Sequence, residues 1–288
     1  MKLKELLAEA ANTEFADIEI SNVKKDSRKV DKGDAFVCIN GVTADGHKFA
    51  KTAAQNGAAV VICEHDVGLE NQLVVDDTRK AYALMCAAFF GNPAKKLKIV
   101  GVTGTNGKTT TCTVLKSILE HFGHKVGLIG TFQNMIGDET LPAKNTTPDA
   151  YELHSLFSLM LSADCDYVVM EVSSHAIDMK RVYGLTYAAC VFTNLTQDHL
   201  DYHKTMENYV AMKENVKKRI FSLCEKAVVN ADDKYAEDII EACDCDVYTY
   251  SVKCDNTTFK AQNICHRVDG VDFEMKGDGV IGRVRFKT

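Results

Sequence analysis

Residues 104–109, Gly-Thr-Asn-Gly-Lys-Thr, have the composition of a phosphate-binding loop. A short apolar segment precedes them, and a segment with helical spacing follows. Backbone N–H groups in such a turn, together with the positive end of the following helix, form an anion site. We therefore expect Gly104 and Gly107 to let the backbone close on phosphate oxygens, Lys108 to hold the outer phosphates and Thr109 to offer its hydroxyl to Mg²⁺.

This loop departs from the usual phosphate-loop pattern at one position. The usual pattern has a glycine five positions before the second glycine, but Val102 stands there, so the loop is the shorter form Gly-x-x-Gly-Lys-Thr. A chance glycine-rich turn is the alternative interpretation. The strand signal before the loop and the helix signal after it favour phosphate binding.

Further side chains that could do chemistry stand near the ends of predicted strands. Glu171 ends an apolar run, and His199 follows the predicted strand Ala188–Thr193. Ligands of open α/β sheets bind at the carboxyl ends of the strands, so both side chains lie where a ligand is expected. By residue type alone, Glu171 could also be a surface carboxylate, His199 a capping or core histidine, and Lys213 a solvated lysine on a helix.

The elements around these residues predict an α/β fold with two domains, 1–92 and 93–288. In the first, the apolar patterns predict an N-terminal amphipathic helix, strands at 33–39 and 57–63, and helices at 48–56 and 78–90. In the second, strands at 98–103, 125–130, 167–172, 188–193 and 227–230 alternate with helices at 108–122, 149–161, 206–221 and 234–242. Such alternation predicts a mostly parallel sheet covered by helices. Beyond about residue 248, the segments 259–264, 271–275 and 280–286 predict a small antiparallel extension.

Bulk composition excludes several classes of protein. The hydrophobic share is 46%, the charged share 26% and the formal charge −6, with Lys217-Lys218-Arg219 as the nearest thing to a basic cluster. We therefore expect no nucleic-acid partner. No apolar run approaches the roughly 20 residues that span a membrane, and the N-terminus does not have the pattern of a signal peptide. A cytoplasmic monomer without a membrane partner is expected.

The 11 cysteines are an odd number at scattered spacings, and most stand in apolar predicted elements, as Cys38, Cys63, Cys86 and Cys190 do. We interpret them as reduced, buried residues of a cytosolic protein. Two further pairs, Cys243-Asp-Cys245 and Cys265-His266, have neither zinc spacing nor a matching second pair. No metal site is expected there.

A set of segments resembles the Mur ligases and their relatives, the folylpolyglutamate synthetases. They are Gly-Val-Thr-Gly-Thr-Asn-Gly-Lys-Thr-Thr (101–110), Asp26-Ser-Arg28, Asn145-Thr-Thr-Pro-Asp149, Met170-Glu-Val-Ser-Ser-His175, the segment from Phe192 to His203, and Met206–Lys213. They occur in the order of the family. Together they are most similar to the Mur ligases that add the third amino acid of the peptide.

This resemblance implies an ATP-dependent amide ligase of peptidoglycan precursor synthesis. ATP would phosphorylate the terminal carboxylate of UDP-N-acetylmuramoyl-L-Ala-D-Glu, and a diamino acid, meso-diaminopimelate or L-lysine, would attack the acyl phosphate. Two anions must meet, so the site needs concentrated positive charge. The implied catalytic residues are Lys108, Glu171, His199 and Lys213. The implied Mg²⁺ ligands are Thr109, Glu171, His199 and Lys213, the last as a carbamate. The implied ATP-binding residues are Gly104, Thr105, Asn106, Gly107, Lys108, Thr109, Thr110 and Asn194.

The same resemblance implies residues that bind the UDP-muramoyl peptide. Lys25, Ser27, Val42, Thr43 and Ala44 would bind the uridine end, Asn145, Thr146 and Thr147 would meet phosphate or carboxylate groups, and Ser173 and Arg181 would contact the muramoyl and peptide portion. Residues 145–147 could also simply cap the helix that follows them. Met179 departs from the family, because many relatives carry Gln there, and the resemblance therefore does not support one of the polar contacts that it would otherwise imply.

Complete Mur ligases have a third, Rossmann-like domain that selects the amino acid, and we expect it to be absent from these 288 residues. Alone, the chain is expected to bind nucleotide and UDP-sugar weakly and to be inactive as a ligase. Two alternatives remain. One is another Mur-type or folylpolyglutamate ligase, although folate enzymes generally begin at the phosphate loop. The other is a non-catalytic nucleotide-binding module.

Overall fold

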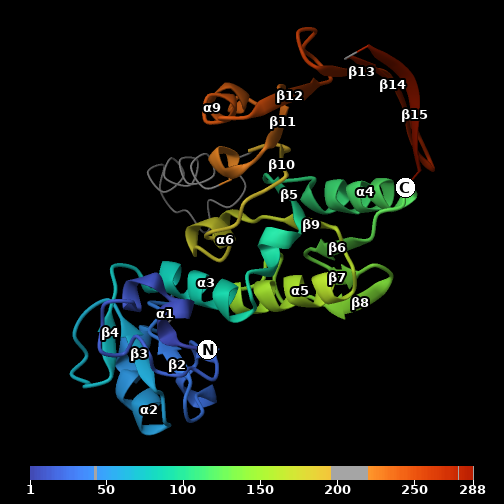
Figure 1. The fold of residues 1–288 in the computed structure, drawn as a ribbon. Helices are drawn as coiled ribbons and strands as arrows, with labels where there is room; N and C mark the ends of the chain where they lie inside the picture. Colours follow the sequence, from blue (N-terminus) through green and yellow to red (C-terminus); the bar gives the residue numbers. More distant parts are fainter. Residues whose placement is uncertain (42–43, 196–219, 278, 288) are drawn as a thin grey trace. The chain divides into compact units, whose positions relative to one another are not determined.

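The structure is a computed structural model that describes residues 1–41, 44–195, 220–277 and 279–287 (Figure 1). Their contacts form two compact units. Unit 1 contains Met1–Leu97, Thr147–Asp164 and His175–Leu185, and unit 2 contains Lys98–Thr146, Cys165–Ser174 and Thr186–Thr288. The predicted domain boundary at residues 92 and 93 stays a prediction.

Unit 1 is built on a parallel sheet whose strands follow one another in chain order. The strands are β1 (Val23–Lys24), β2 (Ala35–Val37), β3 (Val60–Cys63) and β4 (Gln72–Val74). The helices are α1 (Leu3–Leu6), α2 (Ala50–Gln55), α3 (Thr78–Phe89), α5 (Ala150–Ser162) and, apart from its first residue, α6 (Ser174–Asp178). Short 3₁₀ helices are η1 (Ala8–Ala10), η2 (Ser27–Lys29), η3 (Gly46–Phe49) and η4 (Pro93–Lys96).

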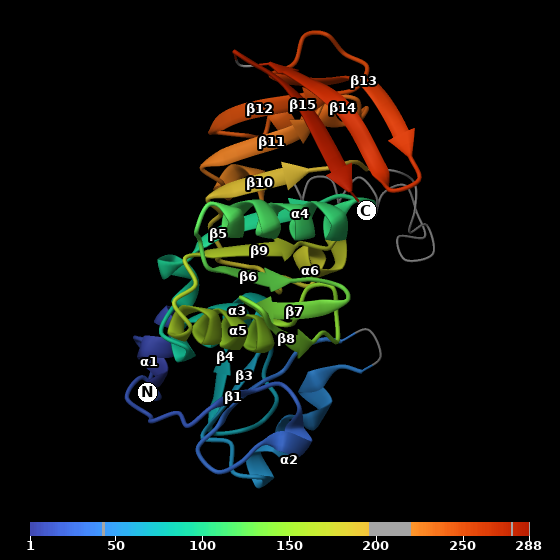
Figure 2. The ribbon, with the colours of Figure 1, turned by 90° about the vertical axis from the view of Figure 1, so that its right-hand side faces the viewer.

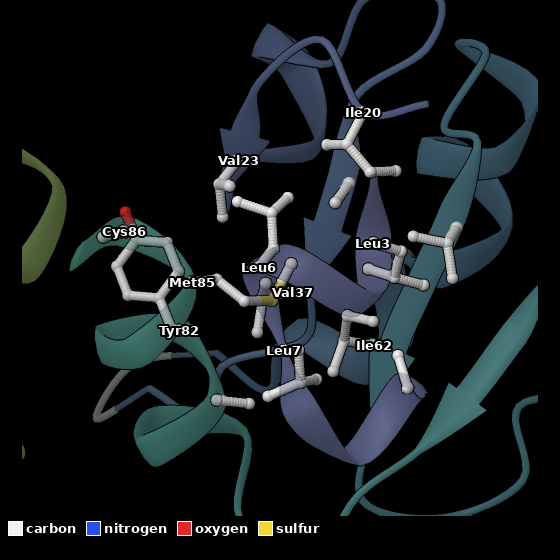
Figure 3. Packing of buried hydrophobic residues seen from close by; sticks show 14 of the residues in the cluster. Leu3, Leu6, Leu7, Ile20, Val23, Val37, Ile62, Tyr82, Met85 and Cys86 are labelled. Carbon is white, nitrogen blue, oxygen red and sulfur yellow. The ribbon is translucent and has the colours of Figure 1, made fainter. Parts of the chain in front are cut away.

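Side chains alternate across this sheet and build a core on each face. Val37 and Ile62 join one cluster, whereas their neighbours Phe36 and Val61 join the other. A parallel sheet covered on both faces has continuous apolar strands of this kind. In the first cluster, the N-terminal leucines meet Tyr82, Met85 and Cys86 of α3 (Figure 3).

Unit 2 contains one sheet, which among the described residues runs in the order β15-β14-β13-β12-β11-β10-β5-β9-β6-β7-β8 (Figure 2). The strands are β5 (Lys98–Thr103), β6 (Val126–Ile129), β7 (Gln133–Ile136), β8 (Glu139–Pro142), β9 (Tyr167–Glu171), β10 (Ala189–Phe192), β11 (Lys226–Asn230), β12 (Asp246–Ser251), β13 (Phe259–Arg267), β14 (Gly270–Gly277) and β15 (Val280–Lys287). Helices in the described part of unit 2 are α4 (Lys108–His121), α9 (Ala236–Ile240) and the 3₁₀ turn η5 (Phe221–Leu223).

The predicted mostly parallel sheet is confirmed, because β12, β11, β10, β5, β9 and β6 all pair in parallel. Helix α4 packs on β5, β6 and β9, where Cys112 joins a cluster with apolar residues of the three strands. The expected antiparallel extension is also present, but β13 pairs in parallel with β12 and antiparallel only with β14. The predicted helix 206–221 lies almost entirely outside the described residues.

The sequence patterns did not reveal β12 or the hairpin of β7 and β8. In the hairpin only Asn134 is buried, so there is no apolar alternation to detect. In β12 only Ser251 is buried. No described helix combines the length and the apolar character that crossing a bilayer requires.

Replacing Met85 with Ala should lower the free energy of unfolding by about 2–5 kcal/mol, because a fully buried side chain would leave a cavity. Leu84→Ala is the matched control on the same helix. The Leu84 side chain is 40% exposed, so its truncation should cost much less. Urea unfolding of both variants measures the difference, and equal losses would contradict the assignment of the core.

Candidate functional site

The predicted phosphate loop lies between the end of β5 at Thr103 and the start of α4 at Lys108. Gly104 and Gly107 have φ angles of 141° and 85°, a region that other residues rarely adopt. A Cβ atom on Gly104 would lie 2.1 Å from the hydroxyl oxygen of Thr193. The loop therefore requires glycine at this position for both conformation and space.

Strand β10 holds the loop in place through the two residues that follow it. The N–H of Thr105 donates to the carbonyl of Asn194 at 2.8 Å, and the N–H of Asn106 donates to the side-chain oxygen of Asn194 at 3.0 Å. The Thr193 hydroxyl donates to the carbonyl of Asn106 at 2.7 Å. Asn194 thus acts as an anchor of the loop, a role that the sequence did not suggest.

Lys108 folds back onto the loop that precedes it. Its ammonium donates to the carbonyls of Gly104 at 2.7 Å and Thr105 at 2.9 Å. Burial lowers the pKa of Lys108, and the negative charge of Glu171 offsets part of that shift. The side chain is half-buried and carries a positive charge beside the turn where an anion would bind.

Glu171 ends β9, next to β5 in the sheet, and its side chain is buried with 1% of its surface exposed. Its Oε1 accepts hydrogen bonds from the Thr109 hydroxyl at 2.9 Å and from the Thr131 N–H at 2.9 Å. Its Oε2 accepts from the Thr131 hydroxyl at 3.0 Å. The parallel register of β5 and β9 therefore brings two predicted site residues, Thr109 and Glu171, into contact.

Sequence reasoning missed Gly130 and Thr131 as part of this site. A Cβ atom on Gly130 would lie 2.8 Å from Oε1 of Glu171, so this glycine makes room for the carboxylate. The Thr131 hydroxyl also lies 3.1 Å from that of Thr146, a predicted substrate residue. The sequence did contain one indication of their role, because Gly130 directly follows the apolar strand β6. The carboxyl end of β6 lies at the same edge of the sheet as that of β9.

The contacts of Thr109 and Glu171 suit a hard cation. Mg²⁺ prefers oxygen ligands and binds through one or two carboxylates together with substrate phosphates and water. A hydroxyl and a buried carboxylate within hydrogen-bonding distance, beside an anion-binding turn, match that preference. Within the described ranges, no three His, Cys, Asp or Glu side chains gather as a ready metal cluster. Phosphate oxygens and water would have to complete the coordination.

Unit 1 contains a cavity of about 180 Å³ with a cationic lining. It is lined by Lys25, Ile39, Gly41, Arg79, Tyr82, Asp149, Ala150, Met179, Lys180 and Arg181. The ammonium of Lys25 lies 2.7 Å from the Asp149 carboxylate, and Arg181 donates to the carbonyl of Thr147 at 2.8 Å. Four cations and one carboxylate surround the cavity, which therefore favours an anionic ligand.

Two of the predicted substrate residues, Lys25 and Arg181, line this cavity, whereas Ser27 does not. Ser27 is buried in η2, where its carbonyl accepts a hydrogen bond from the Asn56 amide at 2.8 Å. The exposed Ala44 accepts at 3.0 Å from the N–H of Gly41, which does line the cavity. The sequence did not single out Arg79, whose guanidinium donates to the sulfur of Met179 and to the carbonyl of Asn40.

The alternative interpretation of residues 145–147 was that they cap the helix that follows them. Helix α5 does have an N-terminal cap, but Asp149 provides it. Its carboxylate accepts from the N–H groups of Tyr151 at 3.0 Å and Glu152 at 3.2 Å. Of the other predicted substrate residues, Thr147 is buried, Asn145 is exposed and Ser173 lies two residues beyond the end of β9. Thr110, a predicted ATP-binding residue in α4, is exposed. Val42, Thr43, His199 and Lys213 lie outside the described residues.

Comparison with known protein families gives two matches. The model of the Mur ligase middle domain matches residues 102–286, and that of the Mur ligase family, catalytic domain, matches residues 19–104. The chain belongs to the Mur ligase family.

Individual Mur ligases agree with this assignment. The chain is 46% identical to the UDP-N-acetylmuramoyl-L-alanyl-D-glutamate--2,6-diaminopimelate ligase of Clostridium botulinum, over 89% of the chain and 53% of the relative. The equally named ligase of Clostridium perfringens is 43% identical over 91% of the chain and 55% of the relative. A solved structure of a ligase of this name superposes with a TM-score of 0.87 at 26% identity, over 99% of the chain and 59% of that structure. The chain thus spans about half the length of the relatives it matches.

Replacing Gly104 with Ala should lower the midpoint of thermal unfolding, because the new Cβ would collide with Thr193 and force the loop out of its conformation. Backbone strain of this kind costs of the order of 1–3 kcal/mol. Gly282→Ala is the control, since nothing lies within 4 Å of a Cβ atom there. An unchanged midpoint for Gly104→Ala would show that the loop has a different conformation.

Asp149→Ala should destabilise the protein at pH 7 by about 1–2 kcal/mol through loss of the helix cap. Burial raises the pKa of Asp149, but the charge and hydrogen bond of Lys25 and two backbone N–H groups lower it more, so that the pKa lies below its ordinary value. The stabilisation is therefore present above pH about 4 and is lost as the pH falls through the folded-state pKa. Urea unfolding of both proteins from pH 7 to pH 3 should show the difference shrinking, and a constant difference would exclude the ionised carboxylate as its source.

Proposed function

We propose that the chain forms the ATP-binding and UDP-muramoyl-peptide-binding parts of an amide ligase. The ligase would add 2,6-diaminopimelate to UDP-N-acetylmuramoyl-L-alanyl-D-glutamate through an acyl phosphate, in peptidoglycan precursor synthesis. One observation carries the catalytic part of this proposal: Lys108, Thr109 and buried Glu171 meet at one edge of the sheet in unit 2. The printed names of the relatives support the substrates, and they favour diaminopimelate over lysine as the amino acid.

In this proposal, unit 2 binds Mg-ATP at the phosphate loop. The N–H groups in the first turn of α4 would face phosphate oxygens, and the ammonium of Lys108 would move from the loop carbonyls onto the outer phosphates. Thr109 and Glu171, whose side chains are hydrogen-bonded to each other, would be the ligands that hold Mg²⁺. The metal would supply positive charge where the γ-phosphate and the carboxylate of the substrate approach each other.

Residues beyond the described ranges complete this assignment. His199 and Lys213, the latter as a carbamate, are proposed to hold a second Mg²⁺, in line with the family resemblance of their segments. A lysine beside bound cations would be repelled as an ammonium, and carbamylation turns it into an anionic oxygen ligand. Thr105, Asn106 and Asn194 are proposed to bind ATP, Asn194 through the loop that it anchors.

The cavity of unit 1 is proposed to bind the anionic UDP-muramoyl peptide. Lys25, Arg79 and Arg181 present cations suited to phosphate or carboxylate, and a guanidinium can bind either group through two parallel hydrogen bonds. Ser27, residues 42–44, Asn145, Thr146, Thr147 and Ser173 are proposed as further contacts of this ligand. Residues 1–92 are accordingly proposed as the UDP-sugar domain and 93–288 as the central ATP-binding domain.

We also propose that the ligase is a cytoplasmic monomer without nucleic-acid or membrane partners. The negative formal charge of −6 supports the absence of a nucleic-acid partner.

Lys108→Ala should weaken the binding of Mg-ATP at least roughly tenfold, because a hydrogen bond to a charged group contributes about 1.5–3 kcal/mol. Lys98→Ala is the matched control, since exposed Lys98 stands at the start of β5, away from the loop that follows the strand. Isothermal titration calorimetry of the 288-residue chain gives both dissociation constants. Equal affinity of the two variants for Mg-ATP would rule out the phosphate loop as the nucleotide site.

UDP-N-acetylmuramoyl-L-Ala-D-Glu should raise the midpoint of thermal unfolding progressively with its concentration. Arg181→Ala should reduce that rise, Arg181→Lys should reduce it less, and replacing the exposed Lys51 of α2 with Ala should not change it. A rise of equal size in all four proteins would show that the ligand binds elsewhere, and no rise in the wild type would contradict the proposed substrate.

A further inference from the structure

Three neighbouring parallel strands of unit 2 each have a cysteine at or just before their amino end. Cys190 is in β10, Cys224 precedes β11 by two residues, and Cys245 directly precedes β12. The register of β11 and β12 pairs Lys226 with Asp246, so the residues just before these strands lie side by side. As a result, the sulfur atoms of Cys224 and Cys245 are 3.6 Å apart.

Cys224, Cys243 and Cys245 differ from the buried cysteines that the sequence predicted. Cys38, Cys63, Cys86, Cys112, Cys165 and Cys190 are buried, but Cys224, Cys243 and Cys245 are only partly buried. All are free thiols in the structure. Within the described part of the chain, the exposed Cys254 and Cys265 do not contact a second sulfur. Cys224 and Cys245 are therefore both accessible and paired.

The thiol of Cys224 donates to the carbonyl of Phe221 at 3.3 Å and has two further cysteines beside it. Its pKa is lowered, first by a hydrogen bond from Cys190 and also by one from Cys245, although burial acts in the opposite direction. The pKa of Cys245 is raised, mainly by burial and then by its hydrogen bond to Cys224. The thiol of Cys245, whose sulfur is 3.6 Å from that of Cys224, can stabilise a thiolate on Cys224 by donating a hydrogen bond to it. A thiolate, not a thiol, is the nucleophile in sulfur exchange.

We propose that Cys224 and Cys245 form a thiol–disulfide exchange site that reacts with low-molecular-weight disulfides. The Cys224 thiolate attacks one sulfur of the disulfide, its S–S bond breaks, and one thiol leaves as the mixed disulfide forms. Cys245 then loses its proton and attacks the Cys224 sulfur, which releases a second thiol and leaves a Cys224–Cys245 disulfide. The two protein thiols lose two electrons, and the small disulfide gains them.

Geometry favours the second step over a lasting adduct. The two sulfurs must approach from 3.6 Å to a bond of about 2.05 Å, which is within the reach of side-chain rotation and small loop shifts. Cys243 is also close, because it forms a hydrogen bond with Cys245. The Cys243 thiol donates to the carbonyl of Ile239, within α9, at 3.2 Å.

This site is separate from the proposed nucleotide site. Cys224 pairs by a backbone β-bridge with Tyr187, which lies before the start of β10. The phosphate loop instead contacts Thr193 and Asn194, which follow the end of β10. The two sites therefore lie at opposite ends of the same parallel strand. Replacing Cys224 or Cys245 should leave the binding of Mg-ATP unchanged, so nucleotide affinity reports on folding in the variants.

The test is to incubate the reduced 288-residue chain with oxidised glutathione near pH 7.5, alkylate the remaining thiols and map the peptides by mass spectrometry. We expect a Cys224–Cys245 disulfide to accumulate, with two glutathione thiols released for each one formed. The Cys224–Cys245 disulfide should form in preference to a lasting adduct on Cys254, because only the pair has a second thiol 3.6 Å away to resolve the mixed disulfide. Reaction of Cys254 or Cys265 ahead of Cys224, or a disulfide between Cys224 and Cys243, would overturn the proposal.

Two variants separate the steps. Cys245→Ser should stop at a stable mixed disulfide on Cys224, because the second thiol is missing. Cys224→Ser should leave Cys245 no more reactive than Cys265. If Cys245→Ser instead lost its glutathione adduct as fast as the wild type, another thiol would be the resolving partner and the assignment to Cys245 would be wrong. The peptide map of the wild-type chain remains decisive even if either variant folds poorly.

Discussion

The contact between the phosphate loop and the end of β10 constrains the rest of unit 2. Gly104 approaches Thr193 so closely that no side chain fits between them, and Asn194 holds the loop by main-chain and side-chain hydrogen bonds. This contact needs β5 and β10 to be adjacent and in register. The same sheet places β9 on the other side of β5, which brings Glu171 to Thr109. The contact of Thr109 with the buried carboxylate of Glu171 thus follows from the order of the three strands β10, β5 and β9.

The sequence was most informative where chemistry and periodicity coincide. The strand, loop and helix around residues 98–121 agree closely with the predicted segments, because a buried strand and an amphipathic helix leave clear apolar patterns. Glu171 was placed at a strand end for the same reason. Thr131, by contrast, follows a strand of only four residues and precedes an exposed hairpin, so no pattern marked it as a partner of Glu171.

Contacts between distant segments account for most of what the sequence could not predict. Arg79 and Lys180 line the cavity of unit 1 from elements about a hundred positions apart, and each looks like a surface cation when considered alone. The pairing of Cys224 with Cys245 likewise depends on the register of β11 and β12, one of which was not recognised as a strand. Residue types suggest what a site could do, but register decides which residues share it.

Helix α5 has a consequence for how the polypeptide can be divided. It packs on α3 within unit 1, yet the strands before and after it in the chain, β8 and β9, belong to unit 2. The backbone thus passes between the units several times instead of once. A fragment ending near Leu97 would lack α5, whose Tyr151 packs against Phe89 and Phe90. The apolar surface of these two side chains would then be exposed to water. No single cut in this chain can release either half with its interior intact.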